Sequence, residues 1–178
     1  MYAAPSPFPK CRVRNRYAKF GLLLVASWCV MTFTHEMGHV VGGWASGGTL
    51  REAHLAPWEL PYSTFEPDPR PLVTLWCGPV LGALVPLALA AVVRRHGAWF
   101  IAYFCLLANG SYLAIAWATG DNLLDTPKLL AHGAHPATIV TYCLLAIGVG
   151  YVGFRRQCIR ILSPSRGEAP EQCGGNKA

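Results

Sequence analysis

Four long apolar stretches limit what this chain can fold into more than any other feature of the sequence. They cover residues 20–43, 71–93, 98–120 and 136–154 of a 178-residue chain, and the last three contain no Asp, Glu, Lys or Arg. A helix needs about 20 residues to cross the roughly 30 Å apolar core of a bilayer. The pattern therefore predicts an all-α, polytopic integral membrane protein built as a bundle of four transmembrane helices.

The composition favours lipid, rather than water or nucleic acid, as the chain's surroundings. Hydrophobic residues make up 53% of the sequence and charged residues only 13%, whereas about 25% is usual for a soluble domain. The net charge of +6 would suit nucleic acid, but the basic residues cluster between the apolar stretches and follow no single polar face. We therefore expect a lipid bilayer as partner and no nucleic acid.

The distribution of Lys and Arg predicts an orientation in the membrane. With the N-terminus in the cytoplasm, the inner segments 10–19, 94–95 and 155–177 hold twelve basic residues, and the outer loops hold only Arg51, Arg70 and Lys128. Cytoplasmic loops carry such an excess of Lys and Arg. An odd number of helices would remove this asymmetry, so the charge count also supports four spans.

The chain divides into a membrane core and two basic ends. We expect a cytoplasmic segment at 1–19, a membrane-embedded core at 20–154 and a polar, disordered tail at 155–178, because the tail is rich in Gly and Pro. The irregular outer loop includes "TLREAHL" at 49–55, which has the character of a short β-strand. We expect that strand to pair with an extended substrate segment.

The motif "HEMGH" places titratable groups near the outer end of the first apolar stretch. His35 and His39 are four residues apart, so on a helix they lie one turn apart on the same face, with Glu36 beside them. Two imidazoles in this arrangement can hold Zn²⁺, while the carboxylate acts on a water at the metal. Ionisable groups inside a spanning helix are costly and usually functional. The alternative is an interfacial helix end with two solvated histidines.

A catalytic zinc site needs a third protein ligand. The extended motif that ends in a third histidine has Ala45 at that position, which excludes the corresponding class. Glu59 is bracketed by prolines that oppose a helix. Asp121 directly follows the third apolar stretch, which runs outward like the first, so it reaches the same membrane depth as the histidines. We prefer Asp121 as the ligand and keep Asp125 as the alternative; either could instead cap a short helix from 125 to 132.

Three further residues are candidates for substrate contact. Gly78 and Pro79 lie near the outer end of the second stretch, where a proline could free a carbonyl for a substrate strand. Gly78 with Gly82 also forms a small-residue face suited to helix packing. Asn109 is a polar side chain in the middle of the third stretch, where an inter-helix hydrogen bond is the usual role.

The chain resembles the site-2 protease family of intramembrane zinc metalloproteases across about residues 20–130. The resemblance rests on "HEMGH", on the following "GGWASGG", on the "GP" pair at 78–79 and on "GDNLL" from Gly120. It implies a small bacterial-type member reduced to the core, with zinc held by His35, His39 and Asp121, Glu36 as base, and a membrane-protein segment as substrate. The chain departs from the family pattern because no proline precedes Asp121 and because the charge count places the site on the outer side.

These observations lead to one preferred function and two alternatives. We expect a zinc-dependent intramembrane endopeptidase in a bacterial inner membrane. A catalytically inactive membrane protein that binds or chaperones partner helices has the same composition. A haem or metal carrier is disfavoured because both motif histidines share one helix face, whereas bis-histidine haem ligation needs rings on opposite sides of the iron.

Overall fold

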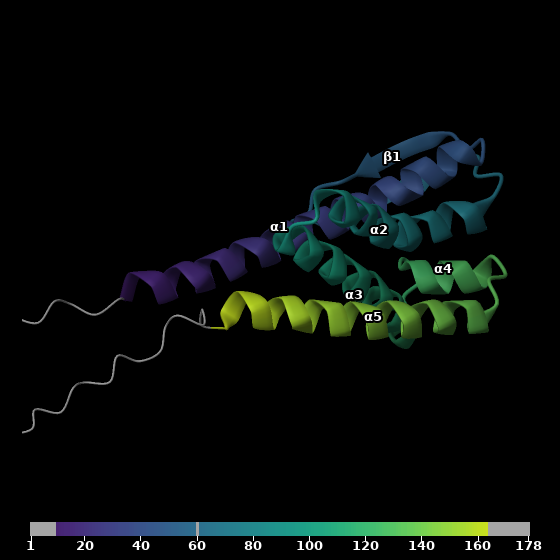
Figure 1. Cartoon of the computed structure of the whole chain (residues 1–178). Coiled ribbons are helices and arrows are strands. Elements are labelled where there is room, and N and C mark those ends of the chain that lie inside the picture. The colour runs from purple at the N-terminus through teal and green to yellow at the C-terminus, as the bar shows by residue number, and fades with distance from the viewer. Residues whose placement is uncertain (1–9, 60, 164–178) are drawn as a thin grey trace, which may run out of the picture.

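A computed structural model describes residues 10–59 and 61–163, with side chains from residue 16 onward. Five helices and a two-stranded sheet make up this part of the chain (Figure 1), in the order α1 Lys10–Ala45, β1 Leu50–His54, β2 Tyr62–Phe65, α2 Pro71–Val93, α3 His96–Thr119, α4 Asp125–Ala131 and α5 Pro136–Leu162. Four of the helices are long and apolar enough to cross a membrane, namely α1, α2, α3 and α5. The prediction of an all-α, four-span membrane protein is confirmed.

The first and last spanning helices are longer than the apolar stretches that predicted them. α1 begins at Lys10, within the segment expected to be a separate cytoplasmic end, and α5 continues to Leu162. The first part of the tail expected to be disordered, residues 155–162, is therefore helical. The rest of both ends, residues 1–9 and 164–178, lies outside the described residues.

Small residues let the spanning helices approach closely. α1 packs mainly on α2, and α3 packs mainly on α5. A Cβ added at Gly42 of α1 would lie 2.6 Å from the Cys77 Cβ of α2, and one at Gly150 of α5 would lie 2.6 Å from the Leu107 backbone nitrogen of α3. Such contacts tolerate no side chain, so glycine at these positions sets the distance between the helices.

The β-hairpin lies along the C-terminal end of α1. β1 pairs antiparallel with β2, with Leu50 opposite Phe65 and His54 opposite Tyr62. The Phe65 ring occupies the space where a Cβ on Gly43 would stand. The short strand expected in the outer loop is therefore present, and it has a partner strand in the same loop that the sequence analysis did not identify.

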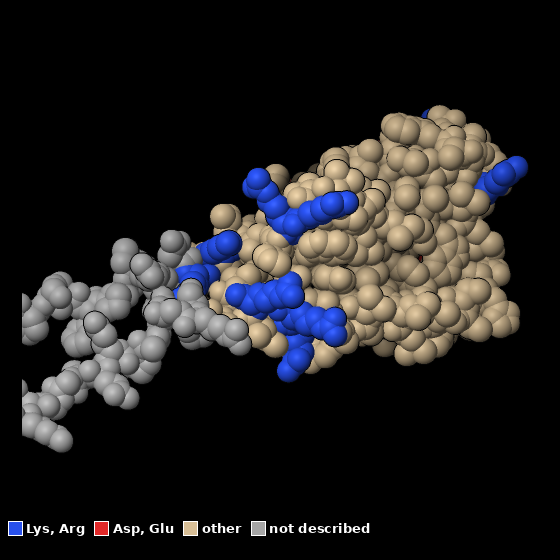
Figure 2. All heavy atoms as spheres, viewed as in Figure 1, with Lys and Arg blue, Asp and Glu red and all other residues tan. Residues whose placement is uncertain are grey.

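Basic side chains gather at the opposite end of the bundle, where α1 begins and α5 ends (Figure 2). Lys19 lies in a shallow hollow with Arg94 and Arg95 of the α2–α3 turn, and Arg160 of α5 lies 3.4 Å from His96 of α3. The ends of the spans are therefore unequal in charge, as the sequence predicted. The N-terminus-inside orientation stays a prediction.

Candidate metal centre

The motif residues all lie on α1 and are all buried. His35, Glu36 and His39 are each 6% exposed, and the two imidazole rings pack edge to face with centroids 4.8 Å apart. This follows from the helical spacing of four residues, which places the rings one turn apart. Their burial excludes the alternative of two solvated histidines at an interfacial helix end.

Asp125, and not Asp121, joins the two histidines. α3 ends at Thr119, and Gly120 takes a left-handed conformation (φ 67°) that turns the chain away from the helix axis. Asp121 is then exposed, and its Oδ1 accepts a hydrogen bond from the Leu123 amide at 2.9 Å. The chain folds back into α4, whose first residue Asp125 is 7% exposed and groups with His35 and His39. The preferred third ligand is corrected accordingly.

Asn109 determines which nitrogen of His35 carries the proton. The Asn109 amide nitrogen donates to the Cys105 carbonyl at 2.8 Å, so the amide oxygen must be the atom that faces His35. That oxygen lies 2.6 Å from His35 Nδ1 and accepts a hydrogen bond from the Nδ1–H group. In a neutral ring the lone pair is therefore on Nε2.

His39 has the same arrangement with a backbone partner. Its Nδ1 lies 2.9 Å from the Thr74 carbonyl oxygen of α2, which can only accept a hydrogen bond. The proton is therefore on Nδ1, and the lone pair is again on Nε2. A Cβ on Gly78, one turn along α2, would overlap this ring, so glycine at that position leaves room for it.

Three acceptor atoms converge as a result. His35 Nε2 lies 2.9 Å from Asp125 Oδ2 and 3.1 Å from His39 Nε2, and the third side of the triangle measures 3.3 Å. Two lone pairs and a carboxylate repel one another unless a proton or a cation lies between them. Tetrahedral zinc with bonds of about 2.0–2.1 Å would separate its ligands by about 3.3–3.4 Å. The donor set thus fits such a metal, and the two shorter separations would open by a few tenths of an ångström to reach this spacing.

The carboxylate charge is also favoured at this position. Burial disfavours ionisation of Asp125, but in the absence of a metal the positive charge of protonated His39 and His35 rings outweighs this effect and holds its pKa well below the usual range. A cation bound by the neutral rings would supply the same attraction. Asp125 is therefore available as an anionic oxygen ligand, because a carboxylate must be deprotonated to bind a metal.

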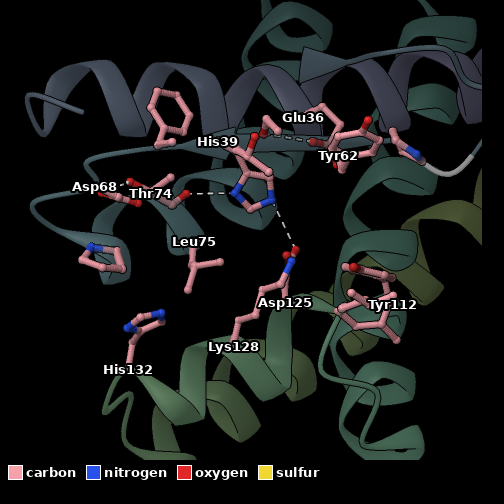
Figure 3. A pocket seen from close by; sticks show the side chains of 17 residues that line it. Glu36, His39, Tyr62, Asp68, Thr74, Leu75, Tyr112, Asp125, Lys128 and His132 are labelled. Carbon is pink, nitrogen blue, oxygen red and sulfur yellow. Dashed lines mark hydrogen bonds and ion pairs between the residues drawn. The ribbon is translucent and has the colours of Figure 1, made fainter. Parts of the chain in front are cut away.

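Glu36 lies beside this cluster and faces a cavity. Its carboxylate accepts a hydrogen bond from the Ser63 hydroxyl of β2 at 3.2 Å. The cavity has a volume of about 340 Å³, and its walls come from α1, β2, the start of α2, Tyr112 of α3 and the α4 region (Figure 3). Glu36 is thus close to the candidate ligands without belonging to their triangle. This is the position that a base acting on a water requires.

The three residues predicted to contact substrate lie behind the site. Asn109 is fully buried and bonded to His35. Gly78 packs against His39, and the Pro79 carbonyl accepts a hydrogen bond from the Tyr142 hydroxyl at 2.7 Å. None of the three lines the cavity next to Glu36. They support the histidines and the helix packing, so the structure does not support direct substrate contact.

Sequence reasoning missed several residues of the cavity. Ser63 and Thr74 come from segments that are distant from α1 in the sequence and contact it only in the folded chain. No local sequence pattern indicates either residue. Lys128 could have been predicted from the sequence. It follows Asp125 by three residues in a short helix, so both side chains lie on the same helix face.

The fold defines a multi-pass helical membrane protein with a buried two-histidine, one-aspartate cluster. Comparison with protein-family models, curated proteins and solved structures finds no match to this chain. The residues of the site are therefore the evidence for its function.

Proposed function

We propose that the chain is a zinc-dependent intramembrane endopeptidase that hydrolyses peptide bonds in or near the transmembrane segments of protein substrates. One observation carries the proposal. The Nε2 atoms of His35 and His39 and Oδ2 of Asp125 converge within 3.3 Å, and Glu36 lies beside them on a cavity.

The residues divide the chemistry between them. His35, His39 and Asp125 would hold zinc, which when bound polarises a carbonyl and lowers the pKa of a water. Glu36 takes a proton from the attacking water and later gives it to the leaving nitrogen. Asn109 and Thr74 keep the two rings in the required tautomer and orientation, as partners of metal-binding histidines generally do.

The cavity suits an extended peptide. A helical substrate shields its carbonyls in hydrogen bonds, so it must unwind before hydrolysis. β2 contributes residues 62–65 to one wall of the cavity, and the α4 region contributes 123–125 and 128 to another. An extended segment could therefore lie between them beside Glu36. The strand that lines the cavity is β2. The sequence predicted instead that the strand now identified as β1 would pair with the substrate.

The location of the site follows from the same proposal. The cluster lies toward the end of α1 that carries the hairpin, opposite the end rich in Lys and Arg. With the basic end in the cytoplasm, the centre lies on the outer side of a bacterial inner membrane. The substrate bond would then be cut near the outer surface.

Metal analysis and a cleavage assay test the proposal. The purified chain is expected to hold about one zinc and to cut single-span model substrates reconstituted with it in vesicles. Glu36→Gln should keep the zinc and lower the rate by roughly 10²- to 10⁴-fold, because it removes only the base. A chelator should abolish cleavage, and added zinc should restore it.

Two other results would contradict the proposal in different ways. A chain that binds zinc but cuts no more than Glu36→Gln would be the inactive membrane protein that binds partner helices. A chain that binds no divalent cation would show that a proton, and no metal, joins the three acceptors.

A further inference from the structure

Lys128 presents a positive charge to the cavity beside the cluster. It follows Asp125 by three residues on α4, so both side chains lie on one face of this helix. The Lys128 side chain extends from α4 toward the region of His39 and Asp125 (Figure 3). No other Lys or Arg is among the residues that line this cavity.

Among the described residues the Lys128 ammonium group forms no ion pair, although the carboxylates of Glu36, Asp68 and Asp125 line the same cavity. The ion pairs there join other residues, and the two that involve Asp125 go to His35 and His39. Lys128 is half-buried, and a lysine removed from water is rarely left without a partner. A ligand with a negatively charged or strongly polar oxygen would supply that partner.

The position of Lys128 relative to Glu36 indicates which oxygen of a ligand the Lys128 ammonium group would contact. Glu36 reaches the cavity from α1, and Lys128 reaches it from α4 on another wall (Figure 3). In peptide hydrolysis the base contacts the attacking water, while negative charge develops on the carbonyl oxygen. A cation on the opposite wall of the cavity from the base is therefore in a position to stabilise the negative charge on the carbonyl oxygen.

We propose that Lys128 is a catalytic residue that contacts the carbonyl oxygen of the scissile peptide bond and stabilises the negative charge formed there. This inference rests on the proposed endopeptidase function. Water adds to the carbonyl carbon, the carbonyl π electrons move to its oxygen, and Glu36 takes the proton. The electron pair then returns, the C–N bond breaks and the Glu36 proton passes to the nitrogen. Lys128 donates hydrogen bonds throughout and transfers no proton.

Neighbouring groups are less suited to this role. The Tyr112 ring also lines the cavity, but it packs edge to face against His35, with centroids 5.3 Å apart, and its hydroxyl carries no positive charge. His132 is exposed and follows the last residue of α4. Lys128 alone combines a permanent charge, partial burial and the face shared with Asp125.

The test compares Lys128→Met and Lys128→Arg with a matched charge removal at Arg51→Met. Arg51 lies on β1 with a side chain 62% exposed, outside the cavity lining. Lys128→Met should lower kcat by about 10²-fold, the usual loss for one such donor, with KM changed less than about threefold and zinc content unchanged. Lys128→Arg should recover part of the rate. Arg51→Met should match the wild type.

A binding measurement makes the result independent of turnover. A phosphinic dipeptide carries a tetrahedral anionic group that resembles the charged oxygen, and its binding to the cobalt-substituted protein can be followed by visible absorption. Its Kd should rise at least tenfold in Lys128→Met and stay unchanged in Arg51→Met. An unchanged Kd and kcat would overturn the inference, and so would loss of the metal from Lys128→Met. If the wild type cuts no substrate, the endopeptidase proposal fails, while this titration still decides the Lys128 contact.

Discussion

At the scale of single residues, the hydrogen bonds behind the two histidines make the short motif a candidate metal site. His35 and His39 would be present on any helix with this sequence, but each ring could use either nitrogen. Asn109 and the Thr74 carbonyl occupy both Nδ1 atoms, so both lone pairs face Asp125. The affinity for a cation therefore depends on residues from α2 and α3 as much as on the motif.

Asp125 and Asp121 provide a matched pair of substitutions at this scale. Loss of a partner behind a metal ligand typically costs 10- to 100-fold in affinity, so Asp125→Asn, which changes a ligand itself, should weaken zinc binding by at least about 100-fold. Asp121→Asn should change it less than twofold, because Asp121 is exposed and bonds only within its own turn. Competition with a chromogenic zinc chelator measures both. A larger loss for Asp121→Asn would restore the ligand that the sequence favoured.

At the scale of elements, α1 and α2 form the frame on which the site is built. Glycines on both helices bring the helices close together, and a Cβ on Gly38 would overlap the Cys77 carbonyl. Gly82 lies where a Cβ would stand 2.9 Å from Asn109 Oδ1. Gly78 and Gly82, which the sequence predicts to be a packing face, therefore also leave room for His39 and for Asn109, the hydrogen-bond partner of His35. Helix packing and site geometry are set by the same residues.

Alanine substitutions at Gly78 and Gly148 distinguish the effect of helix packing on stability from the effect of helix propensity. Gly78→Ala should destabilise the protein by about 1–3 kcal/mol, the usual cost of overpacking, and should weaken zinc binding because the added methyl displaces His39. Gly148 of α5 has nothing within 4 Å of a Cβ, so Gly148→Ala should be neutral or stabilising by up to about 1 kcal/mol. Thermal unfolding in detergent micelles compares the two. Equal effects would show that Gly78 has no special packing role.

At the scale of the whole molecule, the two ends of the bundle differ in charge, and the positive-inside rule predicts from this difference which compartment the site faces. The described basic residues at the charged end come from α1, the α2–α3 turn and α5. The hairpin and the cluster are at the other end. A membrane potential and anionic lipids act on this asymmetry along the whole bundle, so the side on which the proposed cleavage would occur depends on the complete fold.

Cysteine labelling tests that orientation. A cysteine at Trp58, which is 80% exposed in the outer loop, should react with a membrane-impermeant maleimide in intact bacterial cells. A cysteine at Arg155 of α5 should react only after the cells are permeabilised, because the charge distribution predicts that this end faces the cytoplasm. The parent chain gives the background from native cysteines. The reverse pattern would place the candidate centre on the cytoplasmic side.

The sequence alone determined the features that depend on neighbouring residues. Length and hydropathy were enough for four spans, because burying a run of about 20 apolar residues in lipid needs no tertiary partner. A spacing of four placed His35 and His39 on one helix face by helix geometry alone. The same local reasoning indicated a strand in the outer loop and a packing face on α2.

Only the tertiary structure decided which distant groups complete the site. The turn at Gly120 exposes Asp121 and returns the chain so that Asp125 meets the histidines, a difference of four residues that hydropathy does not distinguish. Ser63, Thr74 and Asn109 reach α1 from three separate segments, and Lys128 reaches the cavity with the same turn of α4 that carries Asp125. Hydrogen bonds and electrostatic contacts act over a few ångströms in space regardless of separation in the chain, so these partners became evident only once the helices were packed.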